Sequence, residues 1–229
     1  MIDQTAIRAG VFACLVLPSV SVSAAVQPGD LVLSEFMANP NGVSDTQGEW
    51  LELFNTTASD IDLRGLTLSD DVSNLHVIAS ATPVIAQSGG FTLLGRSANI
   101  DGGGRIPVDY VYRGFTLSNS SDQIVLSEGM QEILRLDYTA SMISPGRSTE
   151  LRQLTSGGPV YAFAPITLSY DGGINMGSPG TANSQTFSVT PVPLPPAINL
   201  LLASLAVIVA GNFIVRQRVQ ERLGLTAVC

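Results

Sequence analysis

Carboxylate side chains are the groups in this sequence with the greatest capacity for chemistry. Asp45, Glu49 and Glu52 lie close together in the chain, as metal ligands or an acid–base pair would require. The surrounding residues indicate a strand, however, and residues three apart in a strand face opposite sides. Glu49 and Glu52 are therefore not expected to converge on one ligand. We expect Glu52 to cap or solvate the sheet.

Three further aspartates are candidate ligands for Ca²⁺: Asp70 and Asp71, which follow Ser69, and Asp101. Loop carboxylates suit Ca²⁺, but the sequence contains neither a D-x-D-x-D-G run nor the glycine-rich repeats of calcium-binding solenoids. We therefore predict no cofactor, with Ca²⁺ as the one alternative.

The remaining reactive residue types form no catalytic constellation. His76 stands alone among alternating apolar residues, and one histidine cannot build a typical zinc site. No serine or cysteine lies in a nucleophile motif. The run DGGGR at 101–105 lacks the lysine and hydroxyl residue of a phosphate loop, so we interpret it as a turn. The sequence predicts no catalytic residue.

The charge balance excludes one class of partner. The sequence has no lysine, and residues 26–191 carry 17 acidic residues against seven arginines, a net charge of −10. Such a surface repels phosphate backbones, so nucleic-acid binding is not expected.

The N-terminal segment has the pattern of an export signal. Arg8 precedes an apolar run from Ala9 to Val20, and Ser23, Ala24 and Ala25 supply the small residues that signal peptidase reads. We predict a signal-peptide helix within residues 1–25, cleaved after Ala25 or Ala24. Cys14 offers a weaker alternative, because its surroundings faintly resemble a lipoprotein acylation site.

The C-terminal segment predicts a membrane anchor. Residues 197–215 contain no charge and would form a helix of about 28 Å, close to the thickness of a bilayer's hydrocarbon core. Arg216, Arg218 and Arg222 follow, which places the tail at 216–229 in the cytoplasm and the domain outside. A buried core helix is the alternative interpretation.

A proline motif precedes this span, within the Ser-, Thr- and Pro-rich spacer at 185–196. It consists of Val192, Pro193, Leu194, Pro195 and Pro196. The order of motif, hydrophobic helix and arginines resembles the PEP-CTERM sorting signals of bacterial exported proteins, in the variant written VPLPA. The resemblance implies processing by an exosortase. Proline also discourages helix, so the motif alternatively serves as a plain spacer before the anchor.

The region between these signals, residues 26–184, predicts an all-β domain. Short alternating runs are separated by Gly, Asn, Asp, Ser and Pro clusters, and a sustained helical period is absent. In LVLSEFM we expect Leu31, Leu33, Glu35 and Met37 on one face. Gly65 marks a bulge or bend in IDLRGLTLSD. Seven or eight strands of this kind favour a β-sandwich.

This region resembles the lamin tail domain, which implies an immunoglobulin-like β-sandwich spanning about residues 29–184, with no catalytic residues of its own. The segments that carry the resemblance are LSEFM (33–37) with Asn39-Pro40, WLELFN (50–55), IDLRGLTLSD (61–70), Gly89-Gly90 before FTLL, LSNSSDQIVLSE (117–128) and the closing GSPGTAN (177–183).

Together these features predict an exported, non-catalytic bacterial protein. We expect it to be held by its helix with the domain outside, then processed to the cell surface or extracellular matrix. Its expected partners are signal peptidase, an exosortase-type enzyme, the membrane, and polysaccharide or other surface proteins. The alternatives are a secreted metal-dependent hydrolase with a carboxylate cluster in a concave pocket, and a Ca²⁺-dependent binding module.

Overall fold

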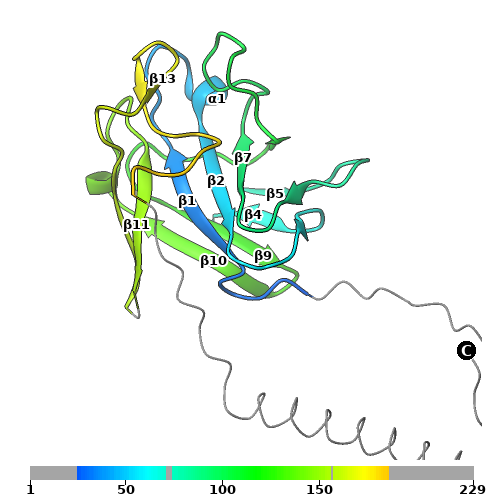
Figure 1. Ribbon diagram of the computed structural model, residues 1–229. Helices are drawn as coiled ribbons and strands as arrows, with labels where there is room; N and C mark the ends of the chain where they lie inside the picture. Colours follow the sequence, from blue (N-terminus) through cyan, green and yellow to red (C-terminus); the bar gives the residue numbers. More distant parts are fainter. Residues whose placement is uncertain (1–24, 71–73, 156, 186–229) are drawn as a thin grey trace, which may run out of the picture. The chain divides into compact units, whose positions relative to one another are not determined.

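A computed structural model describes residues 25–70, 74–155 and 157–185, which fold as two β-sheets packed face to face (Figure 1). Neighbouring strands of the larger sheet are antiparallel, except for the parallel pair β7 and β8. The larger sheet contains, in spatial order, β12 (Gly158–Phe163), β11 (Thr149–Thr155), β1 (Leu31–Met37), β2 (Trp50–Asn55), β7 (Phe91–Gly95) and β8 (Tyr110–Val111).

The second layer is a smaller antiparallel sheet, accompanied by two short ladders. The four-stranded sheet contains β10 (Gln131–Tyr138), β9 (Asp122–Glu128), β4 (Thr67–Ser69) and β5 (Leu75–Val77). The short ladders pair β3 (Ile61–Asp62) with β6 (Ile85–Ala86), and β13 (Ser169–Tyr170) with β14 (Asn175–Met176). The described helices are α1 (Asp45–Gly48) and the 3₁₀ turn η1 (Ala140–Met142).

The main core lies between the two sheets. Leu51 and Leu53 of β2 point into it and meet Leu126 of β9 and Tyr138 of β10 in one buried cluster. Burial of such side chains removes apolar surface from water, which is the dominant favourable term in folding. The predicted all-β sandwich is confirmed.

A β-bulge in β1 changes which residues of this strand face the core. The register against β2 shifts between Leu33 and Glu35, so that Ser34 is the extra residue. Leu33 and Phe36 both reach the main core, whereas Met37 joins Trp50 in a separate cluster. The predicted face containing Leu33, Glu35 and Met37 was therefore wrong beyond Leu33, because a bulge reverses the alternation.

Gly65 separates two short strands that the sequence pattern joins in one run. β3 pairs with β6, while β4 belongs to the four-stranded sheet. Gly65 adopts φ +89°, a conformation open to glycine, and its N–H donates to the Ile78 carbonyl at 2.9 Å. The predicted bend at Gly65 is confirmed, and it redirects the chain from one ladder to another.

The predictions for the chain ends lie outside the described residues. These are the signal segment up to Ala24, the spacer beyond Gln185, the motif at 192–196, the span at 197–215 and the arginines of the tail. Among the residues that the structure describes, no helix is long and apolar enough to cross a bilayer.

Candidate functional site

Three glutamates lie side by side on the six-stranded sheet and form what we call the glutamate row: Glu35, Glu52 and Glu150. Glu35 of β1 is the register partner of both Glu52 on β2 and Glu150 on β11. All three are completely buried. Because Leu51 and Leu53 face the main core, the alternation of β2 places Glu52 on the opposite, outer face. The row therefore lies outside the sandwich core, and another part of the chain must cover it.

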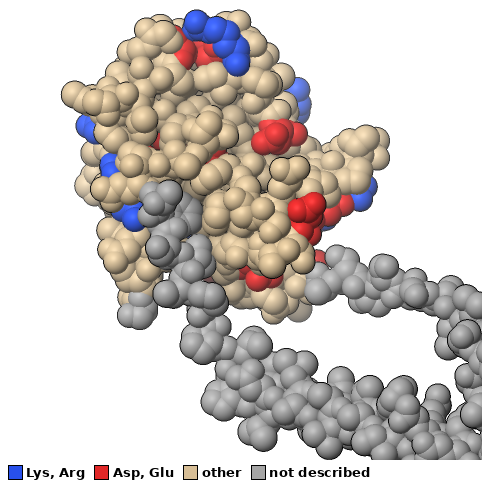
Figure 2. Space-filling view, viewed as in Figure 1, with Lys and Arg blue, Asp and Glu red and all other residues tan. Residues whose placement is uncertain are grey.

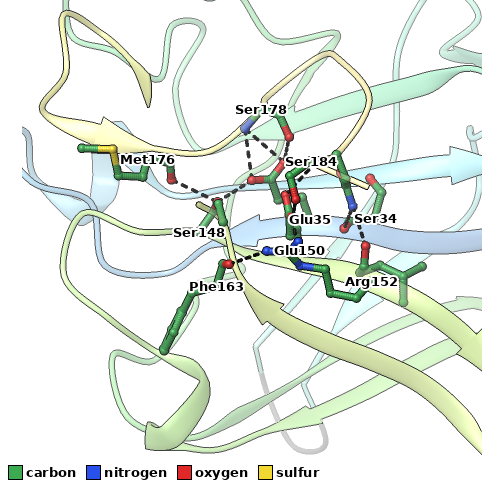
Figure 3. Close-up of polar contacts among 12 residues, drawn as sticks. Ser34, Glu35, Ser148, Glu150, Arg152, Phe163, Met176, Ser178 and Ser184 are labelled. Atoms are coloured by element: carbon green, nitrogen blue, oxygen red, sulfur yellow. Dashed lines mark hydrogen bonds and ion pairs between the residues drawn. The ribbon is translucent and has the colours of Figure 1, made fainter. Parts of the chain in front are cut away.

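The covering part is the segment Gly177–Ser184, which we call the clamp. It follows β14 and runs across β1 and β2 on the outer face of the sheet (Figure 1). Its backbone N–H and hydroxyl groups point at the carboxylates (Figure 3). Each glutamate of the row accepts hydrogen bonds from a different residue of the clamp.

Glu35 has the densest set of donors. The Ser178 N–H lies 3.1 and 3.2 Å from its two carboxylate oxygens, and the Ser178 hydroxyl donates to Oε2 at 2.6 Å. The Ser148 hydroxyl donates to Oε1 from the loop before β11. These donors come from sequence positions more than 100 residues away, so the carboxylate joins distant parts of the chain.

The other two glutamates repeat this arrangement along the clamp. Glu52 accepts the Ser34 hydroxyl at 2.7 Å and the Gly180 N–H at 2.6 Å. Glu150 accepts both the N–H and the hydroxyl of Ser184. Arg152 Nε also lies 3.0 Å from Glu150 Oε1.

Asn183 of the clamp bonds backbone carbonyls of two neighbouring strands, β1 and β11, from outside the sheet. Its side-chain amide donates to the Ser34 carbonyl of β1 at 2.8 Å and to the Leu151 carbonyl of β11 at 3.0 Å. The β1–β11 ladder has only the register pairs of Glu35 and Phe36, so these carbonyls lie beside a gap in the ladder. A buried carbonyl needs a partner, and Asn183 supplies it from outside the sheet.

Two glycines allow the clamp to approach this closely. A Cβ added at Gly177 would lie 2.7 Å from Ser148 Oγ and 2.9 Å from Glu35 Oε1. Gly180 adopts φ +78° while its N–H points at Glu52. The glycines thus have a steric and a conformational role.

The β13–β14 hairpin covers the neighbouring part of the outer face. Tyr170 packs edge-on against Trp50 with ring centroids 6.1 Å apart, and the Trp50 indole N–H donates to the Tyr170 hydroxyl at 3.0 Å. Met37, Leu93 and Ile100 complete this second buried cluster. The hairpin and the clamp form a continuous C-terminal cover over the sheet.

Burial makes the charged form of these glutamates unfavourable. Removal from water raises the pKa of Glu35 from its ordinary value of 4.5 to about 7, although Ser148 and Ser178 oppose the shift. Burial likewise raises the pKa of Glu52 to about 8, opposed by Ser34 and reinforced by the nearby charge of Glu35. Proton uptake by these two groups therefore accompanies folding near neutral pH.

The glutamate row has the geometry of a structural site. The pocket of about 280 Å³ beside the clamp is lined by Ser178, Pro179 and neighbouring residues, and none of the three glutamates lines it. On the face shown in Figure 2, acidic side chains are scattered between wide uncharged areas. Acidic side chains do gather around one described pocket, which is lined by Asp30, Asp60, Asp62 and Glu128, but the described residues form no group of three carboxylates arranged as metal ligands.

The structure separates Glu49 from Glu52, as the sequence predicted. Glu49 lies at the end of α1, where its Oε2 accepts Arg96 Nη1 at 3.0 Å and the Leu117 N–H at 3.3 Å. Burial raises the pKa of Glu49 to about 7 despite Arg96. Asp45 is bonded elsewhere, to the Asn119 amide at 2.9 Å. The expectation that Glu52 solvates the sheet was wrong, because the clamp excludes water from it.

The candidate Ca²⁺ ligands have separate surroundings. Asp101 accepts the N–H groups of Gly103 and Arg105 and pairs with Arg105 Nε at 3.1 Å, which lowers its pKa against the effect of burial. Asp70 accepts the Asn74 N–H at 3.2 Å. Asp71 lies outside the described residues. Within those residues, no three His, Cys, Asp or Glu side chains are grouped as metal ligands would be.

His76 lies in a strand with both ring nitrogens bonded, and the DGGGR run forms a loop, which agrees with its interpretation as a turn. The two ring nitrogens of His76, in β5, lie 2.8 Å from the Arg113 carbonyl and from the Tyr110 hydroxyl. Residues 101–105 form the loop before β8, with Asp101 bonded to its backbone N–H groups.

Comparison with known families agrees with this architecture. The model of the lamin tail domain matches residues 24–140, which is more than half of the chain. The chain belongs to the lamin tail domain family. No curated protein matches it. The lamin tail domain is an immunoglobulin-like structural module, so the family assignment and the observed sandwich agree.

The lamin tail match ends before the parts of the chain that cover the glutamate row. Beyond the match, β11 (Thr149–Thr155) and β12 (Gly158–Phe163) nevertheless belong to the same six-stranded sheet, and the clamp closes its outer face. The sequence contained one indication of this site: GSPGTAN was part of the resemblance, although no role was assigned to it. The glutamates gave no comparable indication: Glu52 was expected to be solvated, Glu35 was placed on one face with Leu31, Leu33 and Met37, and no role was predicted for Glu150.

Proposed function

We propose that this lamin tail protein is an exported, non-catalytic component of a bacterial cell surface or extracellular matrix. Its N-terminal segment directs export, and its C-terminal span holds the domain outside the membrane until an exosortase acts at Val192–Pro196. The observation that carries the proposal is the order of motif, 19-residue uncharged span and arginines directly after a sandwich domain.

The folded domain supports a role in structure or adhesion. Its buried carboxylates bind the chain's own N–H and hydroxyl groups, an arrangement that stabilises the sheet and gives no access to a substrate. The negative charge of the domain disfavours nucleic acid and leaves neutral polysaccharide or other surface proteins as the partners we propose.

The clamp also supports C-terminal attachment. It ends at Ser184, and the proline motif begins at Val192, so the two are separate in the sequence. A pull on residues beyond Ser184 would act on hydrogen bonds to three strands, because Ser178, Gly180 and Ser184 each bond a different strand. A cut at the motif would leave the clamp and the folded domain intact.

The proposal is tested by the C-terminal sequence of the protein recovered from an exosortase-containing bacterium. We expect mass spectrometry to find a chain that ends near Pro196 and lacks residues 197–229. Replacement of Val192–Pro196 by five alanines is expected to leave the span attached and the protein in the membrane fraction.

A matched control replaces Thr186, Ser188 and Thr190, in the same spacer, by alanine; this variant should be processed like the native chain. A native chain that ends at Cys229 in cells with an active exosortase would contradict the processing step.

A further inference from the structure

The first described residues of the domain include a bonded backbone nitrogen next to the predicted cleavage region. The N–H of Val26 donates to Oε2 of Glu128 at 2.9 Å, across 102 positions of sequence. The Val26 side chain is 8% exposed and belongs to the main core, whereas Ala25 is exposed. The fold therefore fixes the chain from Val26 onward.

The surroundings of Val26 favour a positive charge. A pocket of about 810 Å³ beside it is lined by Glu128, Asp30, Asp60 and Asp62, with Arg64 as the basic residue of that lining. Arg64 pairs with Asp62 at 2.6 Å, which leaves the other three carboxylates as net negative charge. The Asp30 carboxylate also accepts the N–H of Gln27 at 2.8 Å.

We propose that signal peptidase hydrolyses the Ala25–Val26 bond and that the new α-ammonium group of Val26 pairs with the Glu128 carboxylate. Water is the co-reactant: its oxygen becomes part of the Ala25 carboxylate, and the released Val26 amine takes up a proton. The inference rests on the export step of the proposed function. It adds which bond is cut and what the new terminus binds.

The geometry distinguishes this bond from the neighbouring one. Cleavage after Ala24 would place the ammonium group on exposed Ala25 and leave an amide at Val26. Cleavage after Ala25 converts the existing hydrogen bond to Glu128 into one between two ionised groups, which is shorter and stronger than a neutral one. The exposed side chain of Glu128 limits the gain through solvent screening.

The absence of lysine provides a specific probe. After cleavage, the α-amino group is the only primary amine of the protein. We would export the full chain from a bacterial host, determine its N-terminus by mass spectrometry, and dimethylate the amine reductively with ¹³C-formaldehyde and cyanoborohydride. An NMR titration then follows one signal. We expect the terminus at Val26, with an α-amino pKa that is about 0.5 or more above that of the Glu128→Gln variant.

Glu132→Gln is the matched control, because Glu132 lies on the same β9–β10 hairpin and pairs with Arg135. This variant should leave the α-amino titration close to that of the native chain. A terminus at Ala25, or equal titration in native and Glu128→Gln chains, would overturn the inference and leave the proposed export standing. A terminus at Met1 would contradict the export step itself.

Discussion

The two faces of the six-stranded sheet are stabilised by different interactions. The inner face packs leucines such as Leu53 against the second sheet, and the outer face places Glu35, Glu52 and Glu150 beneath the clamp. Apolar burial has no direction and does not titrate. The stability of the outer face depends on the geometry of hydrogen-bond donors and on protonation. Single atoms of the clamp therefore affect stability more there than single atoms do in the apolar core.

Removal of the clamp is expected to lower the stability of the domain more than any single substitution considered below. A chain that ends at Met176 loses the hydrogen bonds from Ser178, Gly180 and Ser184 and exposes the three glutamates to water. Each such hydrogen bond contributes a net of about 0.5–3 kcal/mol, depending on the charge of the carboxyl group. The summed loss is a large part of a total stability of roughly 5–15 kcal/mol, so the melting temperature should fall well below that of the native chain. Far-UV circular dichroism with heating measures this, and a chain ending at Gln185 is the control. Equal melting of both chains would show that the outer face needs no cover.

The inner face is tested by Leu53→Ala. Leu53 is 1% exposed in the main core, so the cavity should cost about 2–5 kcal/mol in free energy of unfolding. We expect the same loss at pH 5 and pH 8.5 in denaturant titrations, because no titrating group is removed. Met130→Ala, at a fully exposed position, should change stability by less than about 0.5 kcal/mol. A loss of stability for Leu53→Ala that changes with pH would contradict this expectation, because it would show that packing on the inner face is linked to titrating groups on the outer face.

The close approach of the clamp is tested by Gly177→Ala. The new Cβ would meet Ser148 Oγ and Glu35 Oε1 at 2.7 and 2.9 Å, so the clamp must shift, at about 1–3 kcal/mol. Chemical denaturation gives the cost. Gly157→Ala is the matched control, because its nearest contact would be 3.6 Å away. Equal stability of the two variants would mean that the clamp can shift to accommodate a methyl group at position 177 without loss of stability.

The pH dependence of stability is a further difference between the two faces. The raised pKa values of Glu35 and Glu52 mean that the folded state holds protons that the unfolded state has released. Their contribution is complete below pH 4.5 and is lost as the pH rises through about 7 and 8. At about 1.4 kcal/mol per pKa unit, the free energy of unfolding should fall by several kcal/mol, roughly 6, between pH 5 and pH 9.

The variant Glu52→Gln should reduce that fall. The introduced amide can donate to the Ser34 hydroxyl and accept the Gly180 N–H, so it imitates the protonated carboxyl without titrating. Calorimetric melting at several pH values measures both slopes. If stability depends on pH with the same slope in the native chain and in Glu52→Gln, Glu52 does not contribute to the pH dependence.

Much of the sandwich was predictable because local pattern and burial agree in most strands. The runs at Leu31–Met37 and Asp122–Glu128 are strands in full, and Gly65 bends the chain as its position indicated. The face of β1 beyond Leu33 was not predictable, since a bulge depends on pairing with β2. Most of β11 and β12 lies beyond the part of the sequence in which apolar and polar residues alternate clearly, so these strands were harder to predict.

The glutamate row could not be predicted from the sequence. Glu52 was predicted as a solvated residue because carboxylates are rarely buried without a partner. Its partners, Ser34 and Gly180, are 18 and 128 residues away, so no local spacing could indicate them.

The sequence by itself determined the β-rich composition, the turns and the domain family, because alternation and glycine positions act over a few residues. It also contains the terminal segments on which export, anchoring and processing are proposed. Tertiary structure alone decided that three glutamates become neighbours under the clamp. Burial and hydrogen bonding depend on surroundings that form only when β1, β2 and β11 lie side by side.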